Sequence, residues 1–209
     1  MYDTVIFDLD GTLLDTLDDL TLAVNHTLRQ YNCPMHTKEE IRTFIGNGIN
    51  RLMKNAAPAD TDDDTFNRMF DSFKKYYTAY SVIHTKPFPG ILPMLKILQQ
   101  RGIKTAIVSN KNIEAVQALN EHFFSDYVKI AIGERPRIRR KPYPDTLLEA
   151  MKLLDADKTL YVGDSVVDKQ TADNAGVDCV LVHWGYGIDI DSLHPAAIID
   201  RPDELLDML

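Results

Sequence analysis

The spacing of apolar residues changes character twice along the chain. A short apolar, β-branched run at Thr4–Phe7 predicts a buried strand, because the run is too short for a helix. Between Leu17 and about Ile83, apolar residues recur at helical spacing, with no alternation typical of a strand. From Ile91 onward, short apolar runs alternate with helical segments. The pattern therefore predicts one strand, a block of helices and then a regular strand–helix alternation.

The middle block begins with an apolar helical face along Leu17–Leu28, and Thr16 is its predicted N-cap. Thr37 and Glu40 have the spacing of a capping box ahead of a second helix. An acidic run at 60–64 then leads into aromatic residues at helical spacing. A metal site is one interpretation of this run, but a solvated helix N-terminus is the simpler one. The block therefore predicts an all-helical unit.

The third stretch predicts a parallel sheet, because strand–helix alternation with apolar strands places helices over both faces. Its predicted helices are Ile91–Gln100, Ile113–Phe123, Asp145–Leu154 and Val166–Ala175. Its predicted strands are Thr105–Val108, Val128–Ile132, Leu160–Val162 and Cys179–Val182, followed by a short run at Ala197–Ile199 and a terminal helix at Glu204–Met208. The predicted fold class is α/β with a parallel sheet core.

The helical block interrupts this sheet between its first and second strands. We therefore predict a core domain formed by residues 1–15 and 86–209, and a helical cap inserted at residues 16–85. Two short hinges would join the cap to the core.

Composition narrows the classes of partner. The chain has 209 residues and a formal net charge of −8, which argues against general binding to nucleic acid or to a membrane surface. No apolar run approaches the roughly 20 residues of a membrane span, and the N-terminus lacks the pattern of a signal peptide. Cys33 and Cys179 form no metal-type cluster, and a disulfide framework is not expected. We expect a cytoplasmic monomer or homodimer that binds neither nucleic acid nor membrane.

Polar side chains follow the carboxyl ends of the predicted strands, which is the edge where such sheets bind ligands. Taken singly, each has a simpler explanation, such as a helix cap, a turn or a solvated lysine. Their recurrence at one edge favours a functional site. In chain order, these residues are Asp8, Asp10, Ser109, Asn110, Lys141, Asp164 and Asp168.

Two of these carboxylates, Asp8 and Asp10, stand two residues apart, directly before Gly11, which allows a sharp turn. Like charges this close repel each other unless a cation neutralises them, and Mg²⁺ prefers carboxylate, carbonyl and water oxygens. Taken alone, the motif is equally a strand end with solvated aspartates. Together with the neighbouring strand ends, it favours a Mg²⁺ site.

The order of four short motifs, DLDGTL, SNK, KPYPD and VGDSVVD, resembles that of the haloacid dehalogenase-like hydrolases. The resemblance extends over essentially the whole chain and implies a Rossmann-like sheet with an inserted helical cap. Three further segments resemble the phosphoglycolate phosphatase branch of this family, namely 44–48, 86–90 and 182–187. The same segments also occur in phosphatases of other specificity.

The resemblance implies a role for each motif residue. Asp8 would be the nucleophile that forms an aspartyl-phosphate, and Asp10 the general acid and base. Asp8 and Asp164 would bind Mg²⁺ through their side chains, and Asp10 through its backbone carbonyl. Ser109 and Lys141 would neutralise charge on the phosphoryl group. The supporting and substrate-binding residues implied are Asp168, which orients Lys141 or a metal-bound water, Thr12, which fixes Asp10 by a hydrogen bond, Asn110, and Gly46, Asn47 and Gly48 of the cap.

The function implied is a Mg²⁺-dependent phosphatase acting on small phosphate monoesters. A sugar phosphomutase or a pyrophosphatase of the same family is the main alternative. Dehalogenation is disfavoured because it does not need an acid–base at Asp10. A non-enzymatic receiver domain would need its acceptor aspartate on a later strand and no long cap. A regulatory pseudoenzyme is disfavoured because every motif residue is intact.

Two segments carry open alternatives. Gly46-Asn47-Gly48 is either a simple helix–helix turn or a loop that selects the substrate, and the resemblance favours the second. The basic stretch at 135–141 departs from the branch pattern. It is either a solvated loop that carries Lys141, or a positive field that favours substrates with more than one negative charge.

Overall fold

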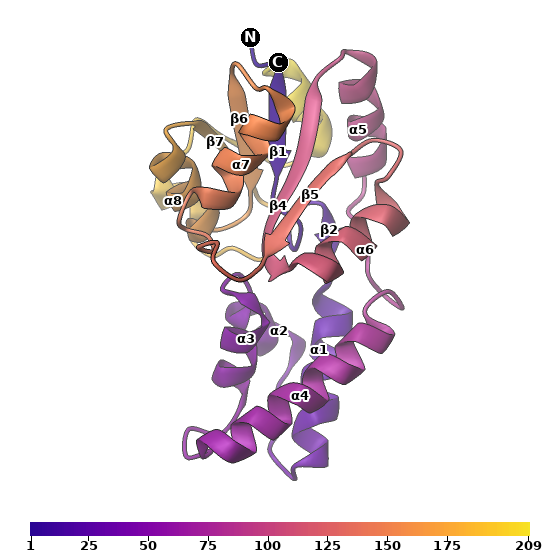
Figure 1. The fold of residues 1–209 in the computed structure, drawn as a ribbon, viewed down its shortest axis with the longest axis vertical. Coiled ribbons are helices and arrows are strands. Elements are labelled where there is room, and N and C mark those ends of the chain that lie inside the picture. The colour runs from indigo at the N-terminus through magenta and orange to yellow at the C-terminus, as the bar shows by residue number, and fades with distance from the viewer. The chain divides into compact units, whose positions relative to one another are not determined.

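A computed structural model describes all of residues 1–209, which fold as two compact units. One unit contains Met1–Asp15 and Pro87–Leu209, and the other contains Thr16–Lys86 (Figure 1). This division differs from the predicted domain boundaries only at Lys86. Two short strands, β2 (Leu14–Asp15) and β3 (Lys86–Pro87), pair with each other where the chain passes between the units.

The core of the first unit is a six-stranded sheet in the order β5-β4-β1-β6-β7-β8, with parallel pairing throughout. Strand β1 lies inside the sheet, between β4 and β6. The chain adds β4 and β5 on one side of it, and then β6, β7 and β8 on the other. The strands are β1 (Thr4–Phe7), β4 (Lys104–Asn112), β5 (Ile130–Glu134), β6 (Thr159–Gly163), β7 (Asp178–Val182) and β8 (Ala197–Ile199). The predicted α/β fold class is confirmed.

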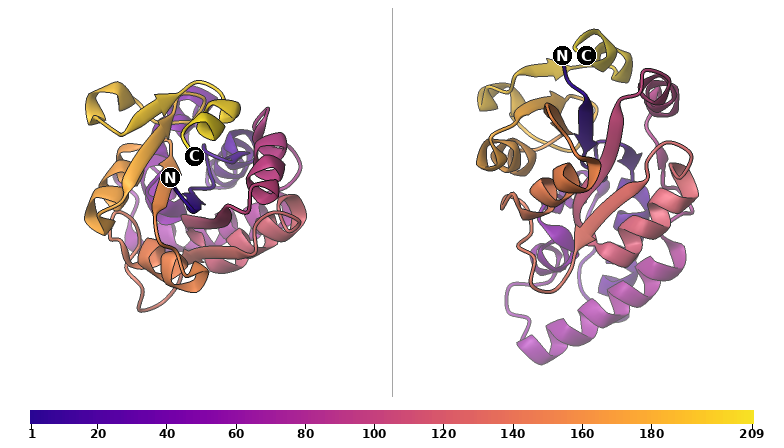
Figure 2. Two further views of the ribbon diagram at one scale, coloured as in Figure 1. Left: turned by 90° about the horizontal axis from the view of Figure 1, so that it is seen from above. Right: turned by 45° about the horizontal axis from the view of Figure 1, so that its top comes forward.

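Helices cover both faces of this sheet, because successive strand residues point to opposite sides. Val5 and Phe7 of β1 pack into one apolar cluster with α5 (Ile91–Gln100) and α6 (Ile113–Phe123). Ile6 packs into the cluster on the other face. That face carries α7 (Asp145–Leu154) and α8 (Val166–Ala175), as the views in Figure 2 show. All four helices have the bounds predicted from the sequence.

Some elements differ from the prediction at their ends. Val128 lies outside β5, because its N–H donates to the carbonyl of Phe124 in the turn after α6. Strand β4 extends to Asn112, beyond the predicted end at Val108, although its regular pairing with β5 shifts between these two residues. The terminal segment is a 3-10 helix, Pro202–Asp207, and another such helix spans Ile190–Leu193. None of the helices in the structure combines the length and apolarity needed to cross a membrane.

The second unit contains α1 (Leu17–Gln30), α2 (Lys38–Phe44), α3 (Gly48–Ala56) and α4 (Asp63–Tyr80), in agreement with the helical pattern. The predicted capping box is present, because Thr37 N–H donates to Glu40 Oε2 at 2.7 Å and Glu40 N–H donates to Thr37 Oγ1 at 3.2 Å. The acidic run caps α4, since Asp62 Oδ1 accepts from a backbone N–H in its first turn. Thr16 occupies the N-cap position of α1, but its side chain makes no capping hydrogen bond.

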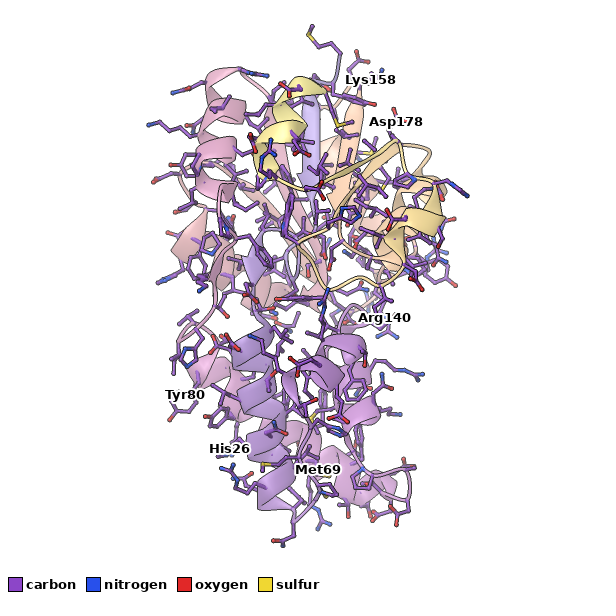
Figure 3. All side chains as sticks on the ribbon, turned by 180° about the vertical axis from the view of Figure 1, so that it is seen from behind. His26, Met69, Tyr80, Arg140, Lys158 and Asp178 are labelled. Carbon is purple, nitrogen blue, oxygen red and sulfur yellow. The ribbon has the colours of Figure 1, made fainter.

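Asp19 joins the two ends of this helical unit. It lies in the first turn of α1 and is buried. Its carboxylate accepts hydrogen bonds from the backbone N–H groups of His84, at 3.0 Å, and Thr85, at 2.8 Å. Figure 3 labels His26 on α1 and Met69 and Tyr80 on α4, and Met69 belongs to the buried core. The hydrogen bonds of Asp19 therefore hold together the two segments through which the chain enters and leaves the unit.

Candidate active site

The register of the sheet places the motif residues at one edge. Phe7, the last residue of β1, pairs with Ile107 of β4 and Val162 of β6. The backbone N–H of Asp8 donates to the carbonyl of Val162 at 2.8 Å, which continues the strand by one residue. Asp164 directly follows the last residue of β6. The carboxyl ends of the central strands therefore present their polar residues together, as predicted.

A buried lysine organises this edge. The Nζ atom of Lys141, which is 3% exposed, donates to Asp8 Oδ1 and Asp168 Oδ1, both at 2.7 Å. It also donates to the Tyr161 hydroxyl at 3.0 Å. Burial opposes the charged form of Lys141, but the charges of Asp168 and Asp8 outweigh it and raise the pKa of Lys141 well above its usual range. Lys141 is therefore an ammonium held between two carboxylates.

Asp168 uses its second oxygen to hold the loop after β6. Its Oδ2 accepts from the Ser165 hydroxyl at 2.6 Å and from the backbone N–H groups of Asp164, at 3.2 Å, and Ser165, at 3.1 Å. Gly163 leaves room for this carboxyl, because a Cβ at position 163 would come within 2.3 Å of Asp168 Cβ. Both oxygens of Asp168 are therefore engaged, an arrangement that suits a residue which positions Lys141.

Asp8, Asp164 and Asp168 form a buried carboxylate cluster, with one oxygen of each lying within 4.8 Å of the others. Burial raises the pKa of Asp8 to about 7, with the Asp168 charge adding to this and Lys141 opposing it. Burial, together with the charges of Asp168 and Asp8, raises the pKa of Asp164 well above its usual range. The three carboxyl groups cannot all be ionised beside the single ammonium of Lys141 unless a further cation compensates their charge, and they offer oxygen donors to it. The cluster therefore fits a divalent cation.

Glycine at position 11 makes room for Asp164. Gly11 has a φ of +87°, which L-residues rarely adopt, and a Cβ there would lie 2.3 Å from Asp164 Oδ2. The same oxygen accepts the backbone N–H of Tyr186 at 2.6 Å. The turn after β1 and the segment after β7 thus enclose the Asp164 side chain, which fixes its position next to Asp8.

Asp10 lies beside a second buried lysine, for which no role was predicted from the sequence. Lys111, from the end of β4, places its Nζ 2.7 Å from Asp10 Oδ1. Tyr161 is a second unassigned residue, and its hydroxyl lies between Lys141 and Asp168. Lys111 is the last residue of the SNK motif. Its position just after an apolar strand, at the edge where ligands bind, could have indicated a role in the site. The sequence gives no such indication for Tyr161, because it lies within the apolar run that forms β6.

The remaining predicted core residues lie around this edge, with different contacts. Asn110 Nδ2 donates to the backbone carbonyl of Lys141 at 3.1 Å, so it links β4 to the Lys141 loop. Ser109 Oγ accepts the backbone N–H of Lys111 at 3.1 Å. Thr12 Oγ1 is buried and makes no hydrogen bond, so the predicted bond from Thr12 to Asp10 is not formed.

Gly46, Asn47 and Gly48 belong to the helical unit, where they form the turn between α2 and α3. Gly46 and Gly48 have φ values of +107° and +77°, which explains glycine at both positions. The turn is therefore established, while a role for it in selectivity stays a prediction.

The basic stretch is largely engaged in local pairs. Arg135 donates to Glu149 at 2.6 Å, and Arg139 forms two hydrogen bonds with Asp145 at 3.0 and 2.9 Å. Arg139 also stacks on the ring of Tyr143, 4.5 Å from its centroid. At least two of the four arginines therefore have their charge matched by α7, which favours the first of the two alternatives, a solvated loop that carries Lys141.

The opposite edge of the sheet carries no comparable cluster of buried charges. There the Tyr2 hydroxyl donates to Asp178 Oδ2 at 2.6 Å, and Lys158 lies over the Tyr2 ring. Lys158 and Asp178 are labelled at this end of the core unit in Figure 3. The tyrosine hydroxyl contact is exposed, so this end is a surface feature rather than a second site.

Comparisons with known proteins agree with this arrangement. The sequence model of a family described as haloacid dehalogenase-like hydrolase matches residues 5–182. A phosphoglycolate phosphatase from Aquifex aeolicus is 30% identical over 98% of this chain and 95% of its own length. One from Cereibacter sphaeroides is 35% identical over 98% and 96%. The crystal structure of a predicted phosphoglycolate phosphatase from Haemophilus somnus superposes with a TM-score of 0.93, at 27% identity, over 99% of this chain and 97% of that one.

Proposed function

The chain belongs to the haloacid dehalogenase-like hydrolases, and we propose that within this family it is a Mg²⁺-dependent phosphatase of small phosphate monoesters. The family resemblance predicted from the four motifs is thereby confirmed. The observation that carries the proposal is the cluster around Lys141, in which Asp8 lies beside an ammonium and two further carboxylates. Phosphoryl transfer depends mainly on positioning and on neutralising charge, and this cluster offers both.

The first proposed step transfers the phosphoryl group to the protein. An oxygen of Asp8 attacks phosphorus while the bond from phosphorus to the ester oxygen breaks. Asp10 donates a proton to the departing oxygen, which leaves as an alcohol. Lys141 stabilises negative charge on the transferring group and keeps Asp8 oriented through their 2.7 Å hydrogen bond.

The second proposed step returns the protein to its starting state. Asp10, now a carboxylate, accepts a proton from water, whose oxygen attacks the phosphorus of the aspartyl-phosphate. The bond between phosphorus and Asp8 breaks, inorganic phosphate leaves, and Asp10 has its proton again. The same side chain therefore serves as acid and then as base: it gives up one proton in the first step and takes one from water in the second, so no other proton carrier is needed.

Asp8 and Asp164 are the side chains that we propose hold Mg²⁺, with the backbone carbonyl of Asp10 as a further ligand. The cation would supply positive charge for the phosphate oxygens. Asp168 is less suited to direct ligation, because both of its oxygens accept hydrogen bonds from the protein. The cluster of three carboxylates supports a divalent cation, and the preference of Mg²⁺ for few protein ligands and several waters supports this ion.

We further propose that the helical unit acts as a cap and that its turn at Gly46-Asn47-Gly48 contributes to substrate choice. The turn carries a single polar side chain, that of Asn47, between two glycines, which supports a contact with a ligand. Relatives named phosphoglycolate phosphatase support 2-phosphoglycolate, or a close analogue, as the substrate.

A phosphate-release assay over a panel of esters tests this function. The panel contains 2-phosphoglycolate, simple alkyl phosphates, sugar phosphates and pyrophosphate. We expect phosphate release from the small monoesters, with 2-phosphoglycolate preferred. Isomerisation of a sugar phosphate without release would instead support the mutase alternative, and a preference for pyrophosphate would support the pyrophosphatase. Release from none of the panel would contradict the proposal.

Removal of divalent cations should abolish turnover. In excess chelator we expect phosphate release to stop, and addition of Mg²⁺ to restore it. Ca²⁺ should raise the unfolding temperature by binding the carboxylate cluster, yet fail to support turnover, because its larger and more flexible coordination differs from that of Mg²⁺. Thermal unfolding and phosphate release, measured on the same samples, separate binding from activity. Full turnover in chelator, or equal turnover with Ca²⁺, would contradict the metal assignment.

A further inference from the structure

Lys111 is a buried cation to which the chemistry above gives no task. It is 5% exposed, and lysine is seldom buried this deeply unless its charge is matched. Its ammonium lies 2.7 Å from Asp10 Oδ1, at the same edge of the sheet as Asp8. We propose that Lys111 is a specificity-determining residue that binds a second negative group of the substrate, located one carbon from the leaving oxygen. This inference rests on the proposed phosphatase function.

The position of Asp10 restricts where such a group can lie. A general acid must come within about 3 Å of the oxygen that it protonates, so the leaving oxygen of the substrate lies beside the Asp10 carboxyl. Lys111 contacts one oxygen of that carboxyl. In 2-phosphoglycolate, the carboxylate is bonded to the same carbon as the leaving oxygen. Once Asp10 contacts the leaving oxygen, that carboxylate lies within reach of the Lys111 ammonium.

The other cations near this edge are less suited to the task. Lys141 is held by Asp8, Asp168 and the Tyr161 hydroxyl. Among the arginines predicted as a positive field, Arg135 pairs with Glu149 and Arg139 with Asp145. The remaining two, Arg137 and Arg140, are exposed to solvent, where charge pairing contributes little. Lys111 is therefore the cation that combines burial with contact to the acid–base residue.

Burial makes the contact selective. A carboxylate that reaches a desolvated ammonium gains a charge-assisted hydrogen bond, whereas a methyl group in the same place gains none. The gain expected from a hydrogen bond to a charged group corresponds to about 10- to 100-fold in kcat/KM. The site would therefore favour small phosphate esters that carry a second anion close to the ester oxygen.

The test compares esters that differ only in this group. The substrates are 2-phosphoglycolate, ethyl phosphate, in which a methyl replaces the carboxylate, and 3-phosphooxypropionate, whose carboxylate lies one carbon farther away. With the native protein at fixed Mg²⁺, we expect kcat/KM to be highest for 2-phosphoglycolate, intermediate for the longer acid and lowest for ethyl phosphate. Equal values for 2-phosphoglycolate and ethyl phosphate would overturn the inference without any variant.

A variant then assigns the preference to Lys111. Lys111→Met keeps the length and apolar stem of the side chain, and we expect it to lower the ratio of kcat/KM for 2-phosphoglycolate to that for ethyl phosphate by about 10- to 100-fold. The matched control, Arg139→Met, removes a cation from the basic stretch and should leave the ratio within about twofold of the native value. Circular dichroism of both variants checks that they are folded.

Each outcome separates the two proposals. If Lys111→Met lowers turnover of both esters equally, Lys111 only positions Asp10, and the inference fails while the phosphatase function stands. If Arg139→Met lowers the ratio instead, the basic stretch selects the substrate. If the native protein releases phosphate from none of these three esters and from no other member of the ester panel, the proposed function itself fails. Should Lys111→Met not fold, Lys111→Gln replaces it in the same comparison, and an unchanged ratio in that variant would overturn the inference.

Discussion

Asp8→Asn is expected to reduce phosphate release by at least about 10⁴-fold, the scale of loss when an enzyme's nucleophile is removed, because Asp8 is the proposed nucleophile. The amide cannot attack phosphorus to form the acyl-phosphate bond. Acid-quenched native protein, incubated with substrate labelled in the phosphoryl group, should retain label on Asp8, and the variant should retain none. The change also removes one charge from a buried carboxylate cluster, so the variant should be at least as stable as the native protein in chelator.

Asp10→Asn is the matched comparison for this experiment, because it removes a carboxylate at the same edge without removing the nucleophile. We expect it to lose about 10²–10⁴-fold in turnover of alkyl phosphates, the usual weight of general acid–base catalysis. With an aryl phosphate, whose leaving group needs no proton, Asp8 should still become labelled. Label on any residue other than Asp8, or more activity in Asp8→Asn than in Asp10→Asn, would contradict the assigned roles.

The grouping of the motif residues was predictable because it depends on topology rather than on detailed packing. Asp8, Lys141 and Asp164 each follow a strand of one parallel sheet, and the carboxyl ends of such strands share an edge. The first and last residues of helices α5 to α8 were also predicted correctly. The apolar period of α5, α6 and α7 is strong, whereas α8 has a weak one, and turn-forming residues mark the start of α5 at Gly90 and the end of α8 at Gly176.

Contacts that depend on side-chain direction were not predictable. Arg139 pairs with Asp145 across the start of α7, which requires knowing how the loop enters that helix. Lys111 reaches Asp10 only because β4 continues past its regular pairing with β5. The contact of Tyr161 was not predictable either. Its hydroxyl contacts Lys141 because Tyr161 lies on one particular face of β6, and the sequence does not indicate on which face it lies. The expected hydrogen bond from Thr12 to Asp10 does not form, and this too depends on the direction of a side chain.

Lys141→Met should be the most damaging single change to stability at this site. The ammonium is buried and hydrogen-bonded to Asp8 and Asp168, so its removal leaves three neighbouring carboxylates without it. Breaking a buried pair by removing one partner costs about 3–5 kcal/mol. For a chain of this size that corresponds to a fall in unfolding temperature of roughly 6–20 °C, measured in chelator. Phosphate release should fall by about 10²-fold or more, because charge on the transferring group loses its partner.

The control for this change is Lys169→Met, which removes an ammonium whose partner, Asp173, is exposed, and it should cost no more than about 1 kcal/mol. The pH dependence gives a second readout. Because burial raises the pKa of Asp8 to about 7, the folded protein holds a proton that the unfolded chain releases above about pH 4. Stability from this group is therefore lost as the pH rises from about 4 to about 7, and in Lys141→Met the loss should continue to higher pH, because Lys141 lowers the pKa of Asp8 in the native protein. A variant that is as stable as the native protein across this range would show that Lys141 does not hold the carboxylate cluster together.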